Sequence, residues 1–208
     1  MRRLLTAALA VLLLSVVASA NVVTLTFEGL ADGATIGNWY NGGGGGNLGI
    51  QFSDNSLALI AIPAGNGNFG GEPSCCTIAF FLSGGADTMN VPAGFDTGFS
   101  FFYSAVNSPG VVNVWSGVDA TGNLLASISL PVTPDACGGY PQDFCPFFPI
   151  GVSFSGTAMS VDFGGTANQI GFDNITLGSD IPGVPEPASM VLLGTGLLGI
   201  ARKIRRKA

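Results

Sequence analysis

Carboxylates are the most numerous side chains in this sequence that could do chemistry. Thirteen aspartates and glutamates are present, together with four cysteines, two tryptophans and no histidine. Every lysine and arginine lies in the first three or the last seven residues, so the stretch from Asn21 to Ala201 carries acidic charge alone. Chemistry in that stretch is limited to carboxylates, hard cations such as calcium, and uncharged polar or aromatic recognition.

The missing cations exclude several classes of function. Nucleic-acid binding needs positive side chains against phosphate, and Ser-His-Asp or Cys-His catalysis needs an imidazole base. Zinc or haem held by histidine is excluded, and four cysteines without a paired CxxC pattern argue poorly for zinc. A glycosidase needs only two carboxylates, but residues such as Asp32 and Asp119 stand in turn-like contexts that acidic residues commonly serve. We expect no enzyme, with glycoside hydrolysis as a distant alternative.

Aromatic residues next to a glycine run are candidates for sugar binding. Trp39 and Tyr40 stand just before the five glycines of residues 42–46, and their rings could stack on the apolar faces of sugars. The alternative is that these rings anchor a mobile glycine loop. Trp115 is a further candidate, but its place in a predicted strand favours core packing.

The four cysteines are candidates for disulfides, because an exported domain meets oxidising conditions. Cys137 and Cys145 would close a short loop, and we favour that bridge. Cys75 and Cys76 are adjacent, and a bridge between neighbours is strained. The alternative is that each of them pairs with one of the other two cysteines, which would pin two loops together.

The N-terminus has the pattern of a secretory signal peptide. Two arginines follow Met1, an apolar run extends from Leu4 to Val17, and Ala18-Ser19-Ala20 offers the small residues that signal peptidase reads. The apolar run is short for a membrane span. We predict a signal peptide over residues 1–20, with an uncleaved anchor as the alternative, and a processed chain that begins at Asn21.

The C-terminus has three parts in a fixed order, within a tail over residues 181–208. Val184, Pro185, Glu186 and Pro187 come first, an apolar stretch over residues 188–201 follows, and a basic end over residues 202–207 closes it. The apolar stretch would form a helix of roughly 21 Å, which is shorter than a hydrocarbon core of about 30 Å. The positive-inside rule keeps the basic end cytoplasmic. Its cations are Arg202, Lys203, Arg205, Arg206 and Lys207.

This order resembles the PEP-CTERM sorting signal. The resemblance implies that an exosortase-type membrane protease is a partner, and that the C-terminal helix holds the chain in the membrane before processing. It also implies release to the cell surface or the extracellular space of a bacterium that makes extracellular polysaccharide and biofilm matrix. The alternative is an ordinary single-pass anchor with a chance Pro-Glu-Pro.

Between the two ends, residues 21–180 are expected to form one extracellular all-β domain. Short apolar or alternating runs recur between Gly, Asn, Asp and Pro, and none shows a sustained helical period. Hairpin turns are expected at residues 119–123 and 164–166. We predict two packed antiparallel sheets in a jelly-roll-like sandwich, with an immunoglobulin-like sandwich as the alternative. The predicted strands cover residues 22–27, 48–53, 57–62, 77–82, 95–104, 111–118, 124–130, 150–154, 159–163 and 169–177.

Parts of this domain resemble the first and last strands of jelly-roll carbohydrate-binding modules. Thr26-Phe27-Glu28-Gly29-Leu30 and Ile170-Gly171-Phe172-Asp173-Asn174-Ile175 carry the resemblance. In such modules these ends lie side by side, and an acidic residue from each often holds a structural calcium. The resemblance therefore implies Glu28 and Asp173 as candidate calcium ligands. The alternative is that Glu28 is a surface residue and Asp173 caps a turn through backbone hydrogen bonds.

These observations favour an exported structural or adhesive protein of the cell surface or biofilm matrix. The alternative is a carbohydrate-binding module for extracellular polysaccharide. Nucleic acid is not expected as a partner.

Overall fold

The computed structural model describes residues 22–137 and 144–183. None of these described segments is a helix long and apolar enough to cross a membrane. The predicted signal peptide and the predicted sorting helix lie outside the described residues, as do the Pro-Glu-Pro motif and the basic end.

Thirteen strands make up the described fold, most of them between three and ten residues long. They are β1 (Val23–Leu25), β2 (Asn41–Gly43), β3 (Gly46–Asn47), β4 (Gln51–Phe52), β5 (Ser56–Ile60), β6 (Thr77–Phe81), β7 (Ala86–Phe95), β8 (Gly98–Ser104), β9 (Gly110–Trp115), β10 (Leu124–Leu130), β11 (Phe148–Ser153), β12 (Ala158–Gly165) and β13 (Gly171–Leu177).

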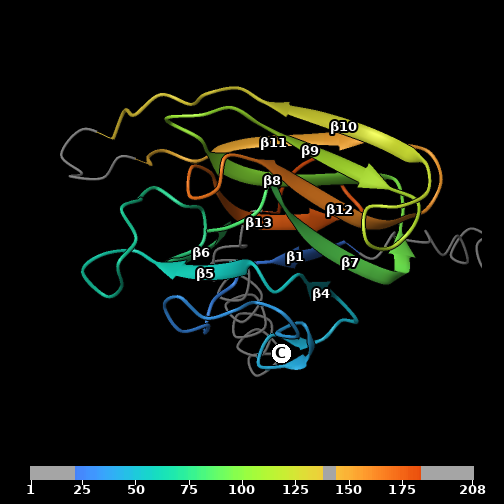
Figure 1. Ribbon diagram of the computed structural model, residues 1–208, viewed down its shortest axis with the longest axis horizontal. Helices are drawn as coiled ribbons and strands as arrows, with labels where there is room; N and C mark the ends of the chain where they lie inside the picture. Colours follow the sequence, from blue (N-terminus) through green and yellow to red (C-terminus); the bar gives the residue numbers. More distant parts are fainter. Residues whose placement is uncertain (1–21, 138–143, 184–208) are drawn as a thin grey trace, which may run out of the picture.

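Two antiparallel sheets form the body of the molecule (Figure 1). The first has the order β11-β8-β13-β6-β5, with β1 also paired to β13, and the second has the order β10-β9-β12-β7-β4. The chain crosses repeatedly from one sheet to the other, so strands that neighbour one another in a sheet are often distant in sequence. The expected all-β sandwich is confirmed, and the strand order is consistent with a jelly-roll-like arrangement.

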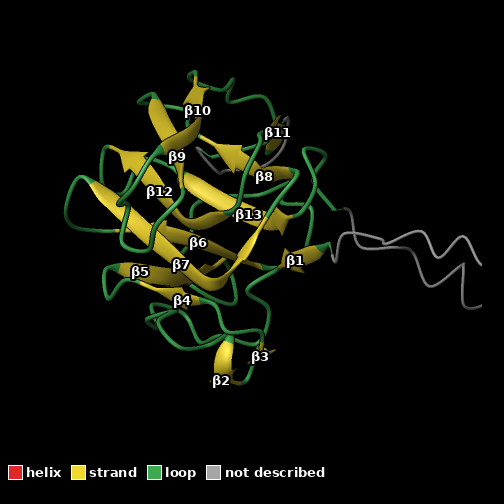
Figure 2. Cartoon of the chain, turned by 90° about the vertical axis from the view of Figure 1, so that its right-hand side faces the viewer, coloured by secondary structure: helices red, strands yellow, loops and turns green. Residues whose placement is uncertain are grey.

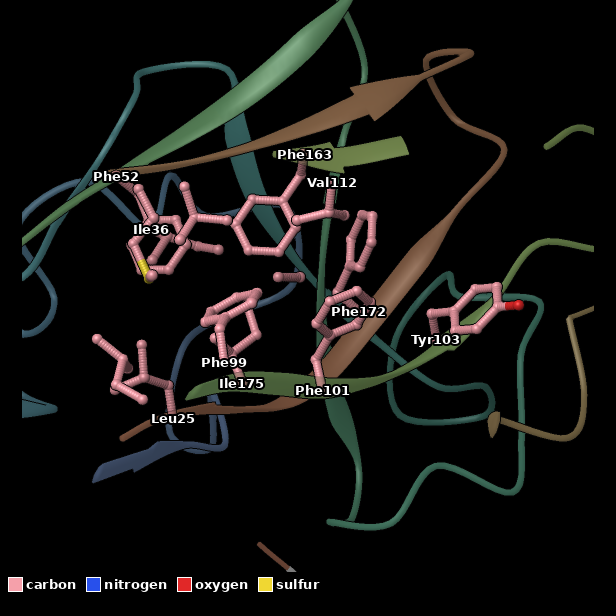
Figure 3. Close-up of a cluster of buried hydrophobic side chains, with 14 of the residues drawn as sticks. Leu25, Ile36, Phe52, Phe99, Phe101, Tyr103, Val112, Phe163, Phe172 and Ile175 are labelled. Atoms are coloured by element: carbon pink, nitrogen blue, oxygen red, sulfur yellow. The ribbon is translucent and has the colours of Figure 1, made fainter. Parts of the chain in front are cut away.

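Phenylalanine rings fill the space between the sheets (Figure 3). Phe99 and Phe101 of β8 and Phe172 of β13 meet Phe163 of β12, which belongs to the opposite sheet. The ring centroids of Phe163 and Phe172 are 4.9 Å apart, and Phe163 lies 6.0 Å from each of the other two. Edge-to-face pairs of this kind contribute about 0.5–1.5 kcal/mol each beyond area burial. The alternation along β8 therefore places its large rings on the inner face.

The first and last strands lie side by side, as the resemblance to jelly-roll modules implied. β1 pairs with β13 in the antiparallel register Val23↔Leu177, Thr24↔Thr176 and Leu25↔Ile175. This pairing brings the residues that follow β1 to the middle of β13. The turn predicted at residues 119–123 is also confirmed, because β9 and β10 form an antiparallel hairpin around it.

Two features of the fold differ from the sequence prediction. The longest strand, β7, was missed, because Pro92 and Gly94 near its end and Asp87 near its start are uncommon in strands. The turn expected at residues 164–166 begins later, since β12 continues through Gly165 and the chain turns at residues 166–169 before crossing to the other sheet.

The glycine run forms a small hairpin of its own. β2 and β3 pair only with each other, and they stand apart from the two sheets of the body (Figure 2). We call residues 41–47 the glycine hairpin. The sequence indicated a mobile loop here because the run has no side chains that favour a strand.

Candidate functional site

Asp173 lies at the centre of a group of acidic residues beneath the paired first and last strands. Its side chain is fully buried in the middle of β13. Ser74 donates to it through its backbone N–H at 3.0 Å and its hydroxyl at 2.9 Å, and the N–H of Asn174 donates at 2.7 Å. Burial, and to a smaller extent the nearby Glu28 carboxylate, raises the pKa of Asp173, whereas these hydrogen bonds lower it. The resulting pKa is about 7.

Glu28 and Glu72 complete this group, which we call the acidic centre. Glu28 accepts the backbone N–H of Thr77 at 2.9 Å, and it lies close enough to Asp173 and Glu72 to raise the pKa of both. Burial is the main cause of the raised pKa of Glu72. The group therefore collects three carboxyls from three separate segments.

The acidic centre offers the ligands that calcium prefers. Carboxylate and carbonyl oxygens are the usual partners of this hard cation. Two of the carboxyls belong to Glu28 and Asp173, the candidate ligands from sequence, and the carbonyl of Thr26 lies 3.5 Å from the Ser74 hydroxyl that contacts Asp173. Because Ser74 and Asn174 already donate to Asp173, a cation would share that carboxylate with them. Asp173 also accepts backbone N–H groups from Ser74 and Asn174, as expected if this residue only caps a turn.

A pocket lies over β5 and β6, beside the loops that carry Asn68, Phe144 and Asn168. It is a shallow depression, and the space of about 290 Å³ between and above its lining atoms includes open solvent. Its floor is apolar and comes from β5, β6, the segment before β13 and the loop that follows β5. The lining residues are Leu59, Asn68, Phe69, Ile78, Phe80, Phe144, Asn168, Ile170 and Gly171.

The rim of this pocket combines an aromatic ring with two amides. Phe144 is half-buried, whereas Asn68 and Asn168 are exposed. The N–H of Phe144 donates to the Asn68 carbonyl at 3.2 Å, which joins two of the loops, and the N–H of Asn168 donates to the carbonyl of Phe81 in β6 at 2.8 Å. Apolar surfaces framed by amides are suited to uncharged ligands that have both apolar faces and hydroxyls.

Trp39 and Tyr40 do not line this pocket. Tyr40 is buried, and its hydroxyl accepts the N–H of Phe27 at 2.7 Å. Trp39 is half-buried beneath the glycine hairpin, and an added Cβ on Gly45 would lie 2.5 Å from its Nε1. That indole N–H is buried without a hydrogen-bond partner. The structure thus places the Trp39 ring against its own loop.

The remaining candidates occupy separate places. Trp115 is half-buried on β9, and its Nε1 is also buried without a partner. Disulfides join Cys137 to Cys145 and Cys75 to Cys76. The first bridge lies behind the pocket, because Phe144 on the rim is adjacent to Cys145. The second lies between Ser74 and Thr77, the two residues that donate to the acidic centre.

A second buried carboxyl was not singled out from the sequence. Asp87 of β7 is 1% exposed and accepts hydrogen bonds from the hydroxyls of Ser53 and Ser56. Burial is the main cause that raises its pKa, and the Asp162 carboxylate adds to this effect, whereas the two hydroxyls lower the pKa. The resulting pKa is about 6. The bonds tie the turn between β4 and β5 to the edge of β7.

Sequence reasoning also missed the pocket. Its aromatic and amide residues are far apart in the sequence, with the two amides at positions 68 and 168, and only the fold brings them together. The one local signal was the Gly-Asn-Gly-Asn segment over residues 65–68, which is typical of a shaped loop.

The described residues form an all-β sandwich with an acidic centre and a small apolar pocket, and the C-terminus carries a recognisable motif. Residues 183–207 match the PEP-CTERM protein-sorting motif. This match confirms the resemblance seen in the sequence, and it indicates an exported protein that exosortase processes.

Solved structures offer only distant likenesses. The CsCBM6-3 module from Clostridium stercorarium, in complex with cellobiose, is 12% identical with a TM-score of 0.39, over 76% of this chain and 93% of that chain. A cleaved adhesin domain of Lys-gingipain from Porphyromonas gingivalis is 14% identical with a TM-score of 0.40, over 76% and 98%. A module of Cellvibrio mixtus lichenase 5A, in complex with cellotriose, is 15% identical with a TM-score of 0.35, over 62% and 89%. No curated protein matches the chain significantly. These scores carry no argument about what the chain binds.

Proposed function

We propose that the sandwich is a non-catalytic module that binds a neutral glycan at the pocket behind Phe144. The observation that carries this proposal is the combination of a partly exposed ring and two exposed amides around an apolar floor. A sugar ring presents apolar C–H faces to aromatic rings and hydroxyls to amides. On this proposal the exported protein holds polysaccharide at the surface, rather than acting only as a structural or adhesive element.

Charge selects the class of glycan. Thirteen carboxylates and no cation lie between Asn21 and Ala201, so an anionic polysaccharide would meet repulsion and no positive partner. A neutral hexose polymer meets neither obstacle.

Two pocket variants test the proposal. Phe144→Ala removes the ring from the rim, and Asn168→Gly removes one amide while tolerating the backbone φ of 61° at that position. Each variant should weaken binding of a neutral oligosaccharide, found first on a glycan array, by about tenfold, which corresponds to the 1–3 kcal/mol of a lost contact. Isothermal titration measures the change.

Asn123→Gly is the matched control, since it removes an exposed asparagine at the start of β10 on the opposite sheet. Its affinity should equal that of the unmodified protein. The proposal fails if no neutral glycan binds, or if the two pocket variants bind as well as the control while their circular dichroism spectra are unchanged.

We also propose that the acidic centre binds calcium. A cation held by Glu28 and Asp173, the two candidate ligands, would offset the repulsion between their carboxylates, so removing calcium with a chelator should lower the melting temperature. Asp173→Asn should abolish the difference between calcium and chelator. Equal melting temperatures of the unmodified protein in both conditions would show that Asp173 serves only as a hydrogen-bond acceptor.

A further inference from the structure

The segment from Glu72 to Thr77 forms a strap across the acidic centre. Ser74 donates its N–H and its hydroxyl to Asp173, and Thr77 donates its N–H to Glu28. The two residues between these donors are Cys75 and Cys76, which are joined by a disulfide. The strap therefore attaches to the body on both sides of the two sulfurs.

Glu72 lies beside those sulfurs. One carboxylate oxygen of Glu72 and the Sγ atoms of Cys75 and Cys76 all lie within 4.8 Å of one another. The Cys75 side chain is exposed, whereas Glu72 and Cys76 are half-buried. Reagents and ions in solution can thus reach one side of the group, while the other side rests on the protein.

We propose that reduction of the Cys75–Cys76 disulfide creates a site for a thiophilic divalent cation, with both sulfurs and Glu72 as ligands. Two thiolates and a carboxylate form a three-ligand set of the type that zinc accepts, with water in the fourth position. Sulfurs bound to one tetrahedral zinc are about 3.7 Å apart, given a Zn–S bond of about 2.3 Å. In the disulfide form the three groups already lie within 4.8 Å of one another, so reduction would leave three ligands next to one another on the same strap.

The chemistry balances with an external thiol as reductant. Two thiol molecules give up two electrons and form one disulfide, and the S–S bond of the strap takes up those electrons with two protons. The cation then displaces the two protons from the Cys75 and Cys76 thiols. Oxidation of the site by a disulfide reverses the sequence and releases the cation. The inference does not depend on glycan binding.

Cadmium titration followed by ultraviolet absorbance tests the proposal, because cadmium–thiolate bonds absorb where the disulfide form gives no such band. The exported protein is first changed to Cys137→Ser/Cys145→Ser, so that only the strap can be reduced. After treatment with a phosphine, which is oxidised to its oxide, the protein should bind one cadmium. Before reduction it should show no thiolate band.

Glu72→Gln in the same background should weaken cadmium binding by at least about tenfold, and Cys75→Ser/Cys76→Ser should abolish it. Equal binding before and after reduction, or an affinity unchanged by Glu72→Gln, would overturn the proposal. If the background variant fails to fold, alkylation of the reduced unmodified protein gives the answer. Zinc should then protect Cys75 and Cys76, but not Cys137 and Cys145, and equal protection of all four would refute the site.

Discussion

Two buried aspartates govern how this protein responds to pH. Asp87 and Asp173 are almost without exposure, and the pKa of each is raised, to about 6 and about 7 respectively. An unfolded aspartate titrates near 3.9, so the folded state binds these protons more tightly. The stability that this provides is complete below the unfolded pKa and is lost as pH rises through the folded values.

Asp87→Asn should therefore flatten the dependence of stability on pH. Without calcium, the unmodified protein should lose stability from pH 4 to pH 8, and the Asp87 part of that loss is about 3 kcal/mol for a shift of roughly two pKa units. The amide of the variant does not titrate, so the free energy of unfolding of the variant should rise relative to that of the unmodified protein as pH increases. Urea unfolding in chelator across this range measures the difference.

Asp54→Asn is the control for this experiment, because Asp54 is an exposed residue one position after Ser53. It should leave the slope unchanged. If the free energy of unfolding of Asp87→Asn depends on pH as it does in the unmodified protein, burial does not raise the pKa of Asp87 in the folded state.

At the scale of elements, the glycine hairpin depends on glycine where it touches Trp39. A Cβ on Gly44 would lie 2.5 Å from the Cζ3 atom of the indole, and one on Gly45 would lie 2.5 Å from its Nε1. The hairpin pairs with no strand of the two sheets, and an isolated hairpin is marginally stable by itself. Its contact with the Trp39 ring, together with the backbone hydrogen bond from Gly45 to the Trp39 carbonyl, therefore holds it in place.

Gly44→Ala should lift the glycine hairpin from the ring. In a Trp115→Phe background, where Trp39 is the one remaining tryptophan, its emission should shift to longer wavelength and acrylamide should quench it more strongly. The clash should lower the free energy of unfolding by about 1–3 kcal/mol. Gly85→Ala, at a position with no atom within 4 Å of the added Cβ, should change neither. Unchanged quenching in Gly44→Ala would show that the hairpin does not cover the ring.

Strands whose side chains alternate could be predicted from sequence, whereas those rich in polar residues could not. β8 and β10 were found because their apolar residues alternate along the strand. β7 was missed because Asp87 is buried there through hydroxyl partners that lie more than thirty residues earlier in the chain. A hydropathy pattern contains no information about such partners, so the polar contact that explains the strand is visible only in the fold.

The same limit applies to the sites. Glu28 and Asp173 could be paired only through the resemblance to jelly-roll carbohydrate-binding modules, and the structure brings both into the acidic centre. Glu72 could not, since it precedes the adjacent cysteines in an irregular segment. The residues of the pocket come from strands β5, β6 and β13 and from the loops that carry Asn68, Phe144 and Asn168, and only the fold brings these segments together.

At the scale of the whole molecule, charge is divided between a cation-free domain and a basic end. The domain from Asn21 onward carries acidic charge alone, whereas five of the seven cations stand in the last seven residues. Each cation costs a few kcal/mol at the bilayer centre, so the basic end opposes passage through the membrane. The PEP-CTERM match over residues 183–207 assigns this end to sorting.

The measurement that tests this account most directly is the intact mass of the protein taken from the surface or medium of its native host. We predict a mass that lacks residues 1–20 and everything after the Pro-Glu-Pro region. Replacing Pro185, Glu186 and Pro187 by alanine should leave the tail uncut and the protein in the membrane fraction. A mass that retains the chain through Ala208, in a host that has an exosortase, would show that the tail is a permanent anchor and would contradict the account.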